Sequence, residues 1–176
     1  FYIFALNILN SNIMDPNAGK KAMFNKLSKA QCLALLEKED FSRKTISFYR
    51  YVILESPSNL RDTLYNSWNN LGVLGRIYLA HEGINAQLSV PEHNWETFVN
   101  DVHSNKYFKD MPFKIAVEDD GKSFYKLTIK VREQIVADGL PVNEYDVTNV
   151  GVHLDAKKWN RFLEEGATVV DMRNHY

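Results

Sequence analysis

The sequence has 176 residues and only one cysteine, Cys32. A single thiol excludes an internal disulfide framework and any zinc site built from several cysteines. Such low cysteine usage fits a reducing, cytoplasmic setting. Cys32 lies on a helix predicted over residues 28–38, and its simplest interpretation is a small buried hydrophobe. The local sequence fixes no His, Lys or Arg next to the thiol that would stabilise a thiolate.

Long apolar runs and an excess of one charge are also missing. Residues 1–9 are apolar, but they are far fewer than the roughly 20 residues that cross a bilayer. They also lack the basic start of a signal peptide, and we expect residues 1–25 to be a poorly ordered leader. Lys and Arg total 21 against 22 Asp and Glu, which excludes a uniformly basic nucleic-acid binder but not a local basic patch.

Motifs that would identify an active site by themselves are absent. There is no P-loop, no Gly-x-Gly-x-x-Gly loop and no nucleophile elbow. Glu82 follows His81, but a zincin needs a second His one helical turn later. These two residues could instead do acid–base work or contact a substrate from a hairpin tip, whereas a loop His is more often simply solvated. No flavin, haem or iron motif is present, so the cofactor is left unassigned.

What the sequence does contain is a regular order of strands and helices over residues 44–135. Strands are expected at residues 44–54, 76–81, 84–90, 113–118 and 123–133, with helices at residues 57–72 and 95–102. Residues 84–90 alternate between apolar and polar positions, as in a sheet with one free face. The order β-α-β-β-α-β plus one strand predicts an α+β, ferredoxin-like domain. Two helices would cover one face of an antiparallel sheet, and the last two strands would form a hairpin.

The segments on either side of this domain are interpreted separately. Residues 26–43 hold the N-terminal helix, and the turn-rich residues 136–153 are typical of a linker. Residues 154–176 begin a new α/β unit, with a helix to about residue 165 and a strand at residues 168–172. Because the chain begins with Phe1 and stops soon after this strand, we expect a fragment whose residues 150–176 are cut rapidly by proteases.

The most informative local feature is the strand predicted at residues 123–133. Four cations share one of its faces with an aromatic and a β-branched residue: Lys122, Lys126, Lys130 and Arg132, with Phe124 and Thr128. Basic side chains with an aromatic among them suit a phosphate backbone and an unstacked base. The alternative is a solvated strand face, because lysine commonly protects an exposed edge.

Five colinear segments resemble the rhodanese-related tRNA uridine hydroxylases. They are residues 47–51, 75–87, 119–124, 135–139 and 170–176, and the resemblance extends over residues 26–176. It implies a ferredoxin-like N-terminal domain followed by a rhodanese domain, of which residues 154–176 are the truncated start. It also implies a tRNA partner and oxygen-dependent hydroxylation of the wobble uridine to 5-hydroxyuridine. In such proteins the rhodanese cysteine lies on a later loop that Cys32 does not match, so we expect this fragment to be inactive.

The resemblance makes tRNA the natural partner of the basic side chains. The candidate RNA contacts are Lys122, Lys126, Lys130 and Arg132, with Arg76 and His81 as weaker candidates. No catalytic or metal-binding residue is assigned. Two other functions stay open: a ferredoxin-like module that binds RNA or a protein without catalysis, and a sulfurtransferase, because rhodanese domains in general carry sulfur on a persulfide cysteine.

Overall fold

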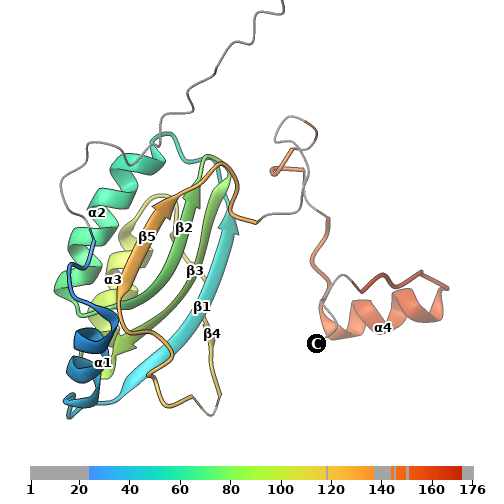
Figure 1. Cartoon of the computed structure of the whole chain (residues 1–176). Helices are drawn as coiled ribbons and strands as arrows, with labels where there is room; N and C mark the ends of the chain where they lie inside the picture. The colour runs from blue at the N-terminus through green and yellow to red at the C-terminus, as the bar shows by residue number, and fades with distance from the viewer. Residues whose placement is uncertain (1–23, 118, 137–143, 145, 150, 172–176) are drawn as a thin grey trace, which may run out of the picture.

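A computed structural model describes residues 24–117, 119–136, 144, 146–149 and 151–171 of the chain (Figure 1). Nearly all of the leader predicted at residues 1–25 therefore lies outside the described residues. Much of the predicted linker at residues 136–153 lies outside them as well.

A five-stranded sheet in the order β4-β1-β3-β2-β5 forms the centre of the domain. Its strands are β1 (Arg43–Tyr51), β2 (Leu74–Ala80), β3 (Gly83–Pro91), β4 (Lys114–Ile115) and β5 (Leu127–Val131). β1 pairs antiparallel with β3 and β4, and β2 pairs antiparallel with β3, whereas β5 lies parallel to β2. The first four strands thus have the ferredoxin-like arrangement and β5 is the added strand, which confirms the predicted α+β fold class.

Helices α2 and α3 cover one face of this sheet (Figure 1). The helical elements are α1 (Lys29–Glu37), α2 (Pro57–Asn70), the 3-10 turn η1 (Glu92–Asn94), α3 (Trp95–Ser104) and α4 (Ala156–Glu164). Ser56 and Pro57 begin α2, and Gly72 follows its end with a φ of +69°, as their residue types predict. The buried Trp68 indole donates to Asp101 Oδ2 at 2.9 Å and so joins α2 to α3. Its N–H is thereby satisfied inside the core.

The alternation of side chains divides the strand residues between two faces. The helix-covered face carries the core: Ile46, Phe48, Ile77, Leu79, Ile84, Ala86, Leu88, Val90, Leu127 and Ile129. The residues between them point the other way, to a face that carries no helix among the described elements and is called the open face below. The predicted alternation of residues 84–90 is confirmed on its apolar side, although Ser89 on the polar side is buried too.

The predicted hairpin between the last two strands is wrong. β4 pairs with β1 at one edge of the sheet, while β5 pairs with β2 at the opposite edge. The apolar residues of β5 are buried against α2. α2 packs near the edge of the sheet that β2 forms, and β5 pairs with β2 at that edge. The turn at residues 119–121 therefore does not reverse the chain into a hairpin, and the segment between β4 and β5 crosses the end of the sheet (Figure 1).

The predicted strands after residue 112 are also too long. β4 has only two residues, and Val117 beyond it is 87% exposed. β5 covers five residues, so Lys122 and Phe124 lie outside it. Residues 168–171 form no strand, because no neighbouring strand is present among the described residues to pair with them, and Val169 and Val170 are exposed as expected. Residue 172 lies outside the described part.

α1 begins at a capping box. Ser28 Oγ accepts from the Gln31 backbone N–H, and the Gln31 side chain accepts from the Ser28 N–H. Cys32 is 3% exposed, and its Sγ accepts a hydrogen bond from Asn25 Nδ2 at 3.2 Å. The thiol therefore has the buried structural position that its simplest interpretation predicts.

Candidate nucleic-acid interface

Strand register arranges the open-face side chains in rows across the sheet. In the strand order β1, β3, β2, β5, one row holds Ser47, Gln87, Arg76 and Thr128, and the next holds Tyr49, Asn85, Tyr78 and Lys130. Neighbours within a row are about 4.8 Å apart and the rows are about 7 Å apart along the strands. Polar, basic and aromatic side chains therefore share one surface.

Three of the predicted RNA contacts meet on this surface. Arg76 on β2 and Lys130 on β5 belong to adjacent rows, although they are far apart in the sequence. Arg132 directly follows β5, and its backbone N–H donates to the Leu79 carbonyl at 2.8 Å. Its guanidinium carbon lies 5.6 Å from the centre of the Tyr78 ring, and all three cations are exposed. The β2–β5 side of the open face is thus a compact basic cluster, which we call the β2–β5 cluster.

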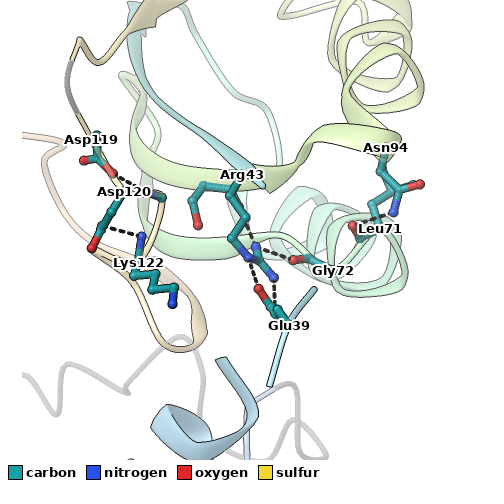
Figure 2. Close-up of polar contacts among 10 residues, drawn as sticks. Glu39, Arg43, Leu71, Gly72, Asn94, Asp119, Asp120 and Lys122 are labelled. Carbon is teal, nitrogen blue, oxygen red and sulfur yellow. Dashed lines mark hydrogen bonds and ion pairs between the residues drawn. The ribbon is translucent and has the colours of Figure 1, made fainter. Parts of the chain in front are cut away.

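The remaining two lysines lie toward the end of the sheet where β1 and β2 begin. The Lys126 carbonyl accepts from Gly75 N at 2.9 Å, so Lys126 borders β5. Lys122 lies in the preceding turn, where its backbone N–H donates to Asp120 Oδ1 at 2.9 Å (Figure 2). The predicted stripe of four cations along one strand is therefore wrong, because the strand begins only at Leu127.

His81 lies at the opposite end of the sheet, at the tip between β2 and β3. The His81 ring is exposed, and its Nδ1 lies 3.0 Å from the Leu54 carbonyl oxygen. Glu82 is buried and accepts a hydrogen bond from the Ile135 backbone N–H at 2.6 Å. Both side chains contact the backbone of neighbouring segments and hold these segments to the hairpin, which is a structural use of residues for which acid–base work or a substrate contact was one interpretation.

An arginine holds the end of the sheet that carries Lys122. The Arg43 side chain is 4% exposed and forms two bonds of 2.7 Å to the Glu39 carboxylate. It also donates to the Gly72 carbonyl at 3.0 Å (Figure 2). Gly121 packs on Arg43 so closely that a Cβ at Gly121 would lie 2.7 Å from the Arg43 Cβ. Arg43 therefore positions the turn from which Lys122 projects.

Asp119 anchors the same turn to the sheet. Its carboxylate accepts from the Thr45 hydroxyl at 2.9 Å, from Gly121 N at 2.6 Å and from the Ser123 hydroxyl at 3.1 Å. Burial alone would raise the pKa of this carboxyl, but the three hydrogen bonds outweigh it and lower the pKa. Asp119 therefore stays ionised and fixes the boundary of the open face on this side.

Sequence analysis missed the tyrosines of the open face. Tyr49 and Tyr51 are 54% and 38% exposed, and Tyr78 is partly exposed. The signal was present, because Tyr49 and Tyr51 alternate with the buried Ile46 and Phe48 along β1 and must point to the opposite face. The predicted RNA contacts were mainly cations of one strand, whereas these rings lie on β1 and β2.

Comparison with known proteins assigns the family. The UPF0176 acylphosphatase-like domain matches residues 43–135, more than half of the chain. The chain belongs to the UPF0176 family. This assignment agrees with the strand order of the sheet and covers every strand described above.

Three curated relatives of this UPF0176 chain carry the same name. The tRNA uridine(34) hydroxylase of Leptospira interrogans is 57% identical over 158 residues, which are 89% of this chain and 43% of the relative. Those of Salmonella arizonae and Escherichia fergusonii are 45% and 44% identical over 156 residues, which are 88% of this chain and 45% of each relative. The resemblance noted from the sequence is thereby confirmed, and the chain spans less than half the length of these relatives.

A solved structure of BlsA in its photo-activated state overlaps with a TM-score of 0.40 at 18% identity, over 74% of this chain and 98% of that one, and this overlap is too low to support an argument. Among the described residues, no helix is both long and apolar enough to cross a membrane. The described part also contains no group of three or more His, Cys, Asp or Glu residues arranged to hold a metal ion.

Proposed function

We propose that this chain is the N-terminal part of a tRNA-modifying oxidoreductase that hydroxylates the wobble uridine of tRNA to 5-hydroxyuridine with oxygen. The observation that carries the proposal is the identity of 57% to a tRNA uridine(34) hydroxylase over 89% of the chain. The complete protein would act in the cytoplasm, on tRNA. The domain described here would contact the tRNA through its open face.

Electrostatics support RNA contact by this domain even though the chain has a net charge of −1. Arg76, Lys130 and Arg132 gather on one exposed surface, and phosphate contacts supply most of the affinity of sequence-independent nucleic-acid binding. We assign these three residues as the main RNA contacts. Lys122 and Lys126 at one end of the sheet, and His81 at the other, are peripheral contacts.

The chemistry of the reaction would belong to the part of the protein that follows. Cys32 is buried and bonded within the N-terminal segment, so it is no accessible nucleophile. Residues 154–176 would begin the rhodanese domain, and α4 fits that role because Trp159, Phe162 and Leu163 expose an apolar side that a folded domain would cover. The chain described here would therefore bind tRNA without modifying it.

Nucleoside analysis of tRNA tests the reaction. In a strain of the source organism that lacks the gene, mass spectrometry of digested tRNA should show loss of 5-hydroxyuridine and of nucleosides made from it. Return of the complete gene should restore them. Loss of a thiolated nucleoside instead would favour a sulfurtransferase, and unchanged tRNA would favour a binding module without catalysis.

Charge reversal tests the assignment of the RNA contacts. In the complete protein, Arg76→Glu with Lys130→Glu should weaken tRNA binding. The fall of log affinity with log salt should also become less steep, by about two in slope, roughly one for each lost phosphate contact. Lys122→Glu with Lys126→Glu changes the net charge by the same amount at the edge of the surface and should have the smaller effect. Equal effects of the two pairs would remove the special role of the β2–β5 cluster.

A further inference from the structure

The open face carries three tyrosine rings whose exposure the core does not require. Tyr49 and Tyr51 expose 54% and 38% of their surface, and Tyr78 is partly exposed. Tyr49 and Tyr78 both pair with Asn85 of β3, from either side, so two strand spacings of about 4.8 Å separate them. The two rings therefore stand about 10 Å apart in one row, on strands that pairing makes rigid.

Each of these two rings has a cation over it. Lys114 Nζ lies 5.8 Å from the centre of the Tyr49 ring, and Arg132 Cζ lies 5.6 Å from the centre of the Tyr78 ring. These distances are near the outer limit of a cation–π contact, about 6 Å, so the cations are held only loosely. A base that stacks on either ring would displace the cation from the ring face, and the cation would then be within reach of the phosphate of that nucleotide.

The charges of the open face indicate which kind of partner it binds. Its strand positions hold Arg76, Lys114 and Lys130, with Arg132 at the end of β5, and none of the open-face positions of the described strands is Asp or Glu. An acidic partner is favoured on such a surface. Rings on the surface of a sheet cannot reach the bases inside a duplex, whereas unstacked bases can lie on them.

We infer that the open face is a stacking platform for single-stranded RNA, on which Tyr49 and Tyr78 each take one unstacked base and Lys114, Arg132 and Lys130 take the phosphates. This inference rests on the proposed function, because it names the form in which tRNA would meet the domain: an unpaired loop and not a helical stem. The exposed Gln87 amide, in the neighbouring row, can donate to and accept from a base edge.

Two anchored segments bound the platform along the strands. At one end, the Asp119 carboxylate accepts from the Thr45 hydroxyl and holds the turn before β5. At the other end, Ile135 is fixed by Glu82, and its carbonyl accepts at 3.3 Å from the amide of Asn85, which lies between Tyr49 and Tyr78 in their row. Each ring therefore takes a base on its own side of Asn85, which limits the platform to a few nucleotides.

Fluorescence anisotropy with a short, fluorescein-labelled oligouridylate tests the platform on the 176-residue chain. Tyr49→Leu and Tyr78→Leu should each weaken binding about 5- to 150-fold, which corresponds to the roughly 1–3 kcal/mol of one base–aromatic stack. Tyr49→Phe and Tyr78→Phe keep the ring and should bind as the unchanged chain does. Tyr125→Leu is the matched control, because Tyr125 precedes β5 outside the open-face rows, and it should leave binding unchanged.

Ultraviolet cross-linking of the unchanged chain to the same oligouridylate tests the platform without any variant, so the result does not depend on whether the Leu variants fold. Peptide mass spectrometry should find the cross-links on the segments that contain Tyr49 and Tyr78. Cross-links only at Lys122 or at α2 would overturn the inference, as would Leu variants that bind like the unchanged chain. A preference for duplex RNA of the same length would overturn it too.

The outcomes separate the platform from the proposed function. If the Leu variants bind normally while deletion of the gene removes 5-hydroxyuridine, the platform is wrong and the function stands. If the complete protein fails to bind oligouridylate that the 176-residue chain binds, another part of the protein covers the open face, and the inference falls. If the platform holds and 5-hydroxyuridine persists without the gene, the domain binds RNA for another purpose.

Discussion

Removal of the buried Arg43 side chain is expected to destabilise the domain strongly. The guanidinium is 4% exposed and holds the Glu39 carboxylate through two bonds of 2.7 Å. It also satisfies the Gly72 carbonyl at the end of α2. Breaking a buried pair by removing one partner costs about 3–5 kcal/mol, because the other charge is left without compensation. Arg43→Ala should therefore lower the free energy of unfolding by about that amount.

Glu39→Gln tests the same ion pair from its acidic side and should have a smaller effect on stability. Glu39 is 19% exposed, and glutamine keeps one acceptor oxygen, so we expect a loss of about 1–2 kcal/mol. Urea unfolding followed by the fluorescence of Trp68 and Trp95 measures both variants and the double variant. A coupling energy above about 1 kcal/mol in this cycle would identify the pair as the cause. The reasoning is refuted if Arg43→Ala costs less than about 1 kcal/mol, or if the two changes simply add.

Three other changes have expected outcomes. Gly83→Ala should cost more than about 3 kcal/mol in thermal unfolding, because its Cβ would lie 2.1 Å from the Arg50 carbonyl oxygen at a φ of +150°; a change below 1 kcal/mol would contradict the close approach. Glu82→Ala should cost about 1–3 kcal/mol and speed proteolysis just before residue 135, since the Ile135 N–H loses its acceptor; unchanged digestion would count against this anchor. Asp119→Asn should flatten the pH dependence of stability at acid pH. The lowered pKa of Asp119 gives stability that is present above the ordinary pKa of an aspartate and is lost as pH falls through the pKa of the folded state. A variant that is as acid-sensitive in unfolding as the unchanged chain would exclude this role.

Local periodicity explains why most of the fold could be predicted from the sequence. The alternation in residues 84–90, the Ser56-Pro57 start of α2 and the capping box at Ser28 each depend on neighbours within a few residues. The partners of β4 and β5 depend on which edge offers apolar surface, and that follows only from the packed helices. The predicted hairpin failed for this reason, because two strands adjacent in sequence were assumed to be adjacent in space.

The candidate site could be predicted only in part for the same reason. Lys130 and Arg132 were recognised within one strand, but the rows that join them to Arg76 and Tyr78 come from the register between strands. Lys122 was placed on the stripe because the alternation was extended through a turn that Asp120 caps. A period of two identifies which residues share a face of one strand, and it carries no information about the face of the next.

The anchor at Ile135 fixes the direction in which the polypeptide leaves the domain. Glu82 holds its N–H and Asn85 contacts its carbonyl, so the chain at Ile135 lies beside the row of Tyr49 and Tyr78. The residues that follow Ile135 in the sequence are therefore attached to the domain next to the open face. Attachment at that point raises the effective concentration of the following residues around anything held there, without a contact of their own. Under the proposed function, the part of the protein that follows would need little affinity of its own for RNA, because the sheet would hold the RNA close to it.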